Sequence, residues 1–327
     1  MTPPARTSGR RAAVIYNPVK VATKKLRDAV AAAEKAGGWA ASLWLETTED
    51  EPGGGLARQA IDAGVEVVLA AGGDGTVRAV AEGLRGSRVA LALIPSGTGN
   101  ILARNLGLNL THLEPSVQAA FAGEDRTIDV GVVELERPDH STETHAFVVM
   151  AGIGLDAKMV ANTDPELKKR VGWLAYADAI RRSLRDAEQL RIEYRTDDDV
   201  TRSMRAHTVL VGNCGTLPGN VLLLPDAEID DGVFDIVALR PEGFAGWSQF
   251  WVKIFWENGV LRRSSIGRKL AGPTKDVRTL RYLRTTSFTA SLDRAEEFEL
   301  DGDEFGTVIG FRAEVDAGAL TVRVPAA

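Results

Sequence analysis

Two glycine-rich segments, each preceded by an apolar run and followed by a helical pattern, constrain the fold of this chain most strongly. The first is GGDGT at 72–76, after the apolar run 65–70, and the second is SGTGN at 96–100, after the run 89–95. Glycine lets the backbone approach a ligand closely and adopt positive φ, and the N–H groups that begin a helix attract anions. Two such units in succession indicate one polyphosphate site built from both turns.

The segments around these turns alternate between apolar strands and helices. We expect strands at 12–16, 40–45, 65–70 and 89–95, and helices at 23–35, 55–63, 77–84 and from 101. This alternation predicts βαβ units around a parallel sheet.

The pattern changes from about Thr127. Period-two segments at 190–194, 234–238 and 321–324, with turn signals at 197–199 and 230–232, predict a mostly antiparallel region that helices near 166–186 and 244–256 interrupt. A chain of 327 residues accommodates about two domains. We therefore predict an α/β domain at 11–126 and a β-rich domain at 127–307, with the tail from 308 to 327 packing back onto the first domain.

Composition excludes several classes of function. The net charge of −6 argues against a general nucleic-acid binder, although residues 257–290 carry eight basic and two acidic side chains. The single cysteine, Cys214, excludes an intrachain disulfide, and no apolar run has the length of a membrane span. We expect a cytoplasmic protein with, at most, a surface attachment to a membrane. The oligomeric state stays open, a homodimer included.

Asp74 places a negative charge among the glycines of the first turn. A carboxylate there would repel phosphate directly, so we predict that a divalent cation, Mg²⁺ held through water, lies between them. A plain surface turn is the alternative for GGDGT taken alone. No G-x-x-x-x-G-K-[ST] motif occurs, so the chain is not a P-loop enzyme.

GGDGTV together with IPSGTGNILARNLGL resembles the diacylglycerol kinase catalytic-domain family, which includes bacterial lipid kinases and the sphingosine and ceramide kinases. The match continues in the family's order through IDVG, GIGLDA, VGNCG, LPDAEIDDGVFDIV and LDGDEFG, which lie between residues 128 and 306. GGDGT alone would also fit NAD kinases and phosphofructokinases.

The resemblance implies an α/β domain of the NAD kinase and phosphofructokinase type that binds ATP and Mg²⁺, and a β-sandwich-like second domain for the lipid. It implies catalytic roles for Asp74 and Asp301, with Asp301 as general base. It implies a structural Mg²⁺ held by Asp231 and by the backbone carbonyls of Glu228 and Val233. The nucleotide-binding residues that it implies are Asn17, Gly72, Gly73, Gly75, Thr76, Ser96, Gly97, Thr98, Asn100 and Asp303.

The sequence departs from the family pattern at two positions. Asn17-Pro18 is followed by Val19-Lys20, where the family often has Ser-Gly, and Asp303 stands where the family has glutamate.

Three of these motifs also have a local interpretation. Asp301-Gly302 and Asp231-Gly232 are strong turn signals in any sequence. GIGLDA at 152–157 fits the dinucleotide fingerprint, but the region that should supply a second strand with a terminal acid reads as helix. We therefore reject a dehydrogenase.

The aromatic segment GFAGWSQFWVKIFWENGVLRR suggests how the acceptor is reached. Its large apolar residues fall on one helical face, which is usually a core face, yet tryptophans followed by arginines also suit an anionic membrane surface. These residues are Trp247, Phe250, Trp251, Ile254 and Phe255. The sequence as a whole predicts an ATP-dependent lipid kinase that acts on diacylglycerol. The alternatives are a kinase for a sphingoid base or another lipid alcohol, an NAD kinase, and a non-catalytic nucleotide-binding regulator.

Overall fold

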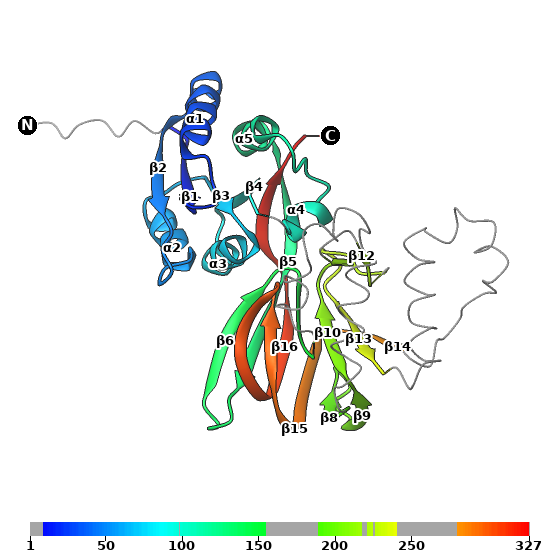
Figure 1. Ribbon diagram of the computed structural model, residues 1–327. Helices are drawn as coiled ribbons and strands as arrows, with labels where there is room; N and C mark the ends of the chain where they lie inside the picture. The colour runs from blue at the N-terminus through cyan, green and yellow to red at the C-terminus, as the bar shows by residue number, and fades with distance from the viewer. Residues whose placement is uncertain are drawn as a thin grey trace, which may run out of the picture. The chain divides into compact units, whose positions relative to one another are not determined.

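The computed structural model describes residues 9–97, 99–154, 189–217, 221–224, 226–240 and 280–326 (Figure 1). The chain forms two compact units, the first made of residues 1–128 and 318–327 and the second of residues 129–317. Strands β5 (Glu124–Glu136) and β16 (Asp303–Val324) each run from one unit into the other. The predicted helices near 166–186 and 244–256, with the aromatic face, lie outside the described residues.

The first unit is built on a parallel sheet, as the alternating sequence pattern predicted. Its strand order is β2 (Ala40–Glu46), β1 (Arg11–Tyr16), β3 (Val67–Gly72), β4 (Ala90–Pro95) and the end of β16. All six residues of β3 are buried, because helices cover both faces of the sheet. The register pairs Tyr16 with Ala71 and Gly72 with Pro95, so β1, β3 and β4 end at one edge.

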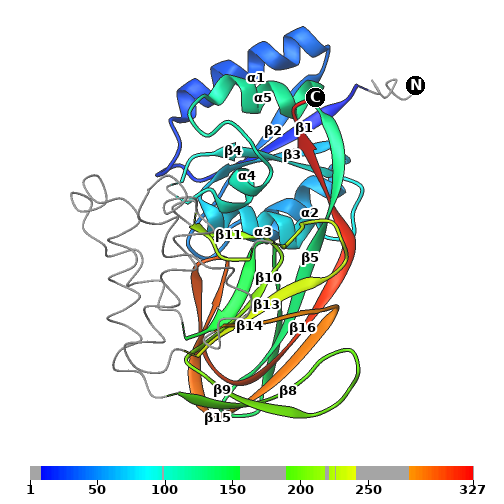
Figure 2. The same ribbon diagram turned by 90° about the vertical axis from the view of Figure 1, so that its right-hand side faces the viewer.

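Two helices pack on each face of this sheet (Figure 2). Helices α1 (Thr23–Gly37) and α5 (Leu113–Ala122) lie on one face, where Leu26, Val30 and Phe121 pack against alternate residues of β1, β3 and β4. Helices α2 (Gly54–Asp62) and α3 (Asp74–Leu84) lie on the other, and the short helix α4 (Ile101–Asn105) follows the second glycine turn. Helix α5 is the one described helix of this unit that the sequence analysis did not predict. None of the helices that the structure describes is long and apolar enough to span a bilayer.

The second unit is mostly antiparallel, which confirms the predicted change of pattern. One run of hydrogen-bonded strands follows the order β14, β13, β10, β7, β15, and β15 also pairs with β8 and β16. The apolar residues of β8 alternate with exposed ones, as expected for a strand with one face on a core. The strands are β6 (Thr142–Phe147), β7 (Met150–Ile153), β8 (Leu190–Arg195), β9 (Arg202–Ala206), β10 (Thr208–Gly212), β11 (Thr216–Leu217), β12 (Val221–Leu222), β13 (Phe234–Leu239), β14 (Leu280–Thr285) and β15 (Ser287–Leu300).

The last residues of the chain belong to the first unit, and they pair in a different sense from the one that their period-two pattern suggested. The segment 321–324 was grouped with the antiparallel strands, but Val322 pairs in parallel with Leu91 in the first unit. Arg323 is 7% exposed and forms a two-point ion pair with Asp125, with Nε–Oδ1 and Nη2–Oδ2 distances of 2.6 and 3.0 Å. A guanidinium in this geometry holds the strand end in place, because two parallel hydrogen bonds fix its direction.

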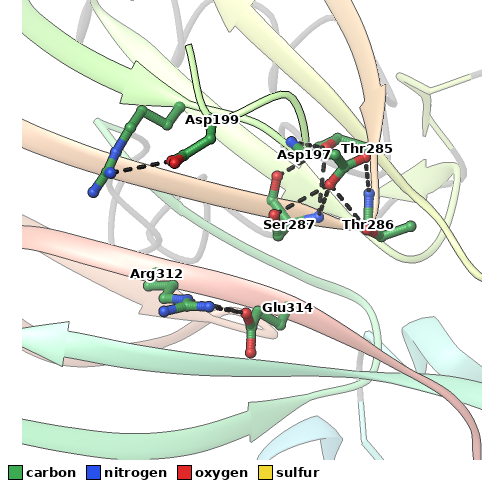
Figure 3. A network of polar contacts seen from close by, with 8 residues as sticks. Asp197, Asp199, Thr285, Thr286, Ser287, Arg312 and Glu314 are labelled. Atoms are coloured by element: carbon green, nitrogen blue, oxygen red, sulfur yellow. Dashed lines mark hydrogen bonds and ion pairs between the residues drawn. The ribbon is translucent and has the colours of Figure 1, made fainter. Parts of the chain in front are cut away.

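The Asp197 side chain connects two turns of the second unit by hydrogen bonds. Figure 3 shows the Asp197 carboxylate facing the turn between β14 and β15, where it accepts hydrogen bonds from the backbone N–H groups of Thr286 and Ser287 at 3.1 and 2.8 Å. The hydroxyls of the same two residues donate to it as well. Asp197 lies in the turn between β8 and β9, so one side chain joins two turns.

Candidate functional site

Three loops of the first unit meet where β1, β3 and β4 end. The N–H of Asn17, after β1, donates to the carbonyl of Ala71 at 2.9 Å, and the N–H of Ser96, after β4, donates to the carbonyl of Gly72 at 3.3 Å. In open parallel sheets ligands bind outside the carboxyl ends of the strands. The two glycine turns therefore lie where the fold favours a ligand.

The glycines of these turns are required by space. A Cβ atom at Gly72 would lie 2.6 Å from the side chain of Thr76, and a Cβ atom at Gly97 would lie 2.8 Å from the Cα atom of Gly73. The backbones of the two turns are thus in contact, and Thr76 packs on Gly72. A side chain at Gly97 would push the two turns apart, and one at Gly72 would displace Thr76.

The Asp74 carboxylate ties one turn to the other. Its Oδ1 accepts a hydrogen bond from the N–H of Ile101 at 2.7 Å, and its Oδ2 accepts one from the N–H of Asn100 at 3.0 Å. Asp74 is the first residue of α3, three residues before the helix start at 77 that the sequence suggested, and α4 begins at Ile101. A negative charge is favourable at helix N-termini, and the Asp74 carboxylate lies at the N-termini of both α3 and α4. The carboxylate therefore has a structural reason to stand among the glycines.

The same carboxylate is compatible with the implied Mg²⁺. Each carboxylate oxygen has two lone pairs, and the bonds to Asn100 and Ile101 use one on each. A hydrated cation can contact the remaining lone pairs through its water ligands. Asp74 thus fits a water-mediated metal contact in addition to its contact with the second turn.

The second turn is held by its own side chains. The Asn100 amide accepts from the N–H of Gly97 at 3.1 Å and donates to its carbonyl at 2.8 Å. Asn100 has φ of 46°, a left-handed conformation that costs free energy for a residue other than glycine. Arg104 Nε donates to the carbonyl of Gly99 at 2.7 Å, and the Ser96 hydroxyl donates to the carbonyl of Ile94 at 3.0 Å. Thr98 lies outside the described residues.

The loop after β1 brings a cation to the first turn. The Asn17 side chain accepts from the N–H groups of Val19 and Lys20 at 3.0 and 3.2 Å and so closes a tight turn. The Lys20 Nζ atom would lie 2.8 Å from a Cβ atom at Gly73. In the sequence, Val19-Lys20 stands out only as a departure from the family pattern. The one local signal for the position of Lys20 near the first glycine turn was that it lies four residues after Tyr16, the last residue of β1.

In the second unit, Asp301 lies in a tight hairpin between β15 and β16. Asp301 and Gly302 have φ of 52° and 91°, and Leu300 pairs with Asp303 across the turn. Positive φ at both central residues is the geometry that an Asp-Gly hairpin turn favours. The turn interpretation of the sequence is therefore correct, and the same residue carries the implied base. Asp303 is exposed beside it at the start of β16.

The Asp301 carboxylate is buried and held by backbone donors. The side chain is 3% exposed, and it accepts N–H bonds from Val148, Val149 and Met150 at 2.9, 2.8 and 2.9 Å. Hydrogen bonds from several N–H groups to one carboxylate are charge-assisted and fix its position. Asp301 is thus held in a fixed orientation.

A second layer of contacts supports this arrangement. Asn213 is fully buried, and its side-chain amide donates to the carbonyls of Asp129 and Val148 at 2.9 and 3.2 Å. Cys214 Sγ donates to the carbonyl of Val148 at 3.5 Å. Burial, and then the negative charge of Asp301, raise the pKa of the Cys214 thiol. The VGNCG motif therefore supports the segment that holds Asp301.

Asp231 is paired with a cation of the chain. Its Oδ1 accepts from the N–H of Val233 at 3.2 Å, and its Oδ2 pairs with the Arg284 guanidinium. Arg284 Nε also lies 3.5 Å from Oδ1 of Asp235. Burial of the Asp235 carboxyl group raises its pKa. A divalent ion on Asp231, with the carbonyls of Glu228 and Val233, would lie beside this guanidinium, whose positive charge repels it. The residues of this turn therefore do not fit the implied Mg²⁺ as they stand.

Comparison with known proteins gives two family matches. The diacylglycerol kinase catalytic domain matches residues 11–133, and the YegS C-terminal NAD kinase beta sandwich-like domain matches residues 148–245. A Pseudomonas aeruginosa (strain UCBPP-PA14) protein named probable lipid kinase YegS-like is 34% identical over 68% of this chain and 70% of its own length. A Bacillus subtilis (strain 168) diacylglycerol kinase is 30% identical over 72% of this chain and 76% of its own length.

Solved structures agree in fold. A crystal structure from Bacillus anthracis str. Sterne described as a diacylglycerol kinase is 18% identical with a TM-score of 0.67, and covers 98% of each chain. Another crystal structure from the same organism is 22% identical with a TM-score of 0.71, and covers 99% of this chain and 98% of the other. With these matches along both units, the chain belongs to the diacylglycerol kinase catalytic-domain family of lipid kinases.

Proposed function

We propose that this protein is an ATP-dependent diacylglycerol kinase. It transfers the γ-phosphoryl group of ATP to the free hydroxyl of diacylglycerol, which gives phosphatidic acid and ADP. The observation that carries the proposal is the pair of glycine turns that Asp74 holds together at the carboxyl edge of the first unit's sheet. A bare backbone surface beside the N-terminus of α3 suits a polyphosphate.

Each unit supplies a different part of the chemistry. In the first, backbone N–H groups of the glycine turn at the start of α3 orient the phosphates, and Asp74 holds the second turn beside it through the N–H groups of Asn100 and Ile101. Mg²⁺, when bound, neutralises phosphate charge as the leaving group departs. In the second, Asp301 accepts the proton of the attacking hydroxyl, and its three backbone donors keep its orientation fixed while it does so.

The nearest alternative enzyme is an NAD kinase, because GGDGT suits that chemistry equally well. The names of the relatives favour a lipid acceptor, since both the Pseudomonas and the Bacillus protein are named as lipid or diacylglycerol kinases. A lipid acceptor also implies peripheral attachment to a membrane, which we propose with it. A non-catalytic regulator is a third alternative, and the presence of Asp74 and Asp301 weighs against it.

The test is phosphoryl transfer from γ-labelled ATP to a panel of lipid alcohols in mixed micelles. The panel holds diacylglycerol, monoacylglycerol, phosphatidylglycerol and a sphingoid base, and a parallel reaction holds NAD without lipid. We expect label in phosphatidic acid, and at least a hundredfold less with Asp74→Ala. Label in NADP alone would replace the proposal with the NAD kinase, and no transfer to any acceptor would favour the regulator.

A further inference from the structure

Lys20 is a cation at the first glycine turn whose place the family resemblance does not explain. It follows β1 in a turn that Asn17 closes, and its Nζ atom lies over Gly73. Within the part of the chain that the structure describes, the Lys20 ammonium has no carboxylate partner at ion-pair distance. An exposed ammonium normally stays in solvent, so a position directly over a glycine backbone calls for a reason.

Charge balance supplies that reason. The Asp74 carboxylate accepts hydrogen bonds from the N–H groups of Asn100 and Ile101, and among the described residues Lys20 forms no ion pair with it, so a salt bridge to Asp74 does not account for the position of Lys20. A nucleotide polyphosphate would bring several further negative charges to the same turn. Lysine is a compact point charge that binds phosphate without the planar geometry that arginine requires.

We propose that Lys20 binds the phosphate chain of the nucleotide at the first glycine turn. This inference rests on the proposed function, because it assigns a ligand contact at the same site. Lys20 is thereby a binding residue that the sequence motifs do not contain. The absence of a side chain at Gly73 leaves room for the ammonium, because a Cβ atom there would lie 2.8 Å from it.

An exposed lysine on a loop can also contact an anionic membrane, and the two roles differ in what they recognise. A phosphate contact discriminates among nucleotides by their phosphates, whereas a membrane contact leaves nucleotide affinity unchanged. Lys25 offers a matched control, since it is an exposed lysine of α1 with no such glycine contact in the described structure.

The experiment is calorimetric titration of the full-length protein with adenosine, ADP and ATP in the presence of Mg²⁺. The proteins compared are wild type, Lys20→Met, Lys20→Arg and Lys25→Met. For Lys20→Met we expect the Kd for ATP to rise by about tenfold to a hundredfold, the value of a hydrogen bond to a charged group. The rise should be smaller for ADP and absent for adenosine. Lys20→Arg should recover most of the loss, and Lys25→Met should match wild type.

Three results would overturn the inference. An unchanged Kd for ATP in Lys20→Met, with weaker flotation on phosphatidylglycerol vesicles, would assign Lys20 to the membrane. An equal loss for adenosine and ATP would indicate a disturbed fold rather than a phosphate contact. If wild type itself bound no ATP, the proposed function would fail together with this inference, whereas the first two results leave the function standing.

Discussion

Replacement of Asp74 by asparagine separates the two roles that its carboxylate can have. If Asp74 acts only through Mg²⁺, the metal-free protein should not be weakened, since the change removes a charge that has no partner. The structure gives the carboxylate two partners, the N–H groups of Asn100 and Ile101 at 3.0 and 2.7 Å. We therefore predict that Asp74→Asn destabilises the first unit even when no divalent ion is present.

The size of the effect follows from these two bonds. A hydrogen bond to a charged group contributes about 1.5–3 kcal/mol to stability, and the half-buried position of Asp74 places each bond toward the lower end. Asparagine keeps one acceptor oxygen and turns an N–H donor toward the other partner. The net loss should be about 2–3 kcal/mol, which lowers Tm by roughly 5–10 °C for a unit of this size.

The assay is thermal unfolding by calorimetry in buffer with EDTA, then again with Mg²⁺. Asp28→Asn is the control, because Asp28 is an exposed carboxylate of α1. It should shift Tm by less than about 2 °C. An Asp74→Asn protein whose Tm in EDTA equals or exceeds that of wild type would refute the argument that this carboxylate joins the turns.

Three further predictions concern the second unit. Asp301→Asn should leave ATP affinity unchanged, reduce transfer by at least about a hundredfold and lower stability by about 2–4 kcal/mol, because a buried N–H loses its charged acceptor; near wild-type turnover in the micelle assay would remove Asp301 from the chemistry. Arg284→Gln should lower Tm in EDTA, because Asp231 and Asp235 lose their cationic partner, and Mg²⁺ should not restore it; a Tm that recovers when Mg²⁺ is added would mean that this turn binds the metal. Partial burial raises the pKa of Asp197, but hydrogen bonds from Thr285, Thr286 and Ser287 outweigh it and lower the pKa to about 2. The ionised Asp197 carboxylate therefore stabilises the fold at pH values above the unfolded pKa near 4, and this stabilisation is lost as pH falls toward 2. The free energies of unfolding in urea of Asp197→Ala and wild type should differ at pH 6 and converge near pH 2; a difference independent of pH would contradict this.

Local patterns in the sequence were enough to predict most of the scaffold. The segments 65–70 and 89–95 are continuous apolar runs because helices cover both faces of β3 and β4. Asp301-Gly302 forms the hairpin that its dipeptide favours. Helix α5 was missed. Its apolar residues give a weaker amphipathic pattern than those of α1, because residues on most of its sides are buried.

Local sequence patterns could not predict the contacts of the candidate site residues, because these contacts join residues far apart in the chain. Asp74 bonds to residues 26 and 27 positions later, and Asp231 pairs with Arg284, 53 positions away. Such partners are set by the register of the sheets, which no spacing in the sequence specifies. The sequence alone therefore suggested a metal as the reason for a carboxylate at Asp74 among the glycines. The structure adds a second reason, the backbone N–H groups of Asn100 and Ile101 that this carboxylate accepts hydrogen bonds from.

The glycine turns as a nucleotide site can be tested most directly by one binding measurement on Gly97→Val. The valine side chain would force Gly73 and Gly97 apart, because even a Cβ atom at this position lies 2.8 Å from the Cα atom of Gly73. Calorimetric titration with Mg²⁺ and ATP should show tight binding to wild type and no detectable binding to this variant, while circular dichroism shows that both are folded. A folded Gly97→Val protein that binds ATP as well as wild type does would contradict the account.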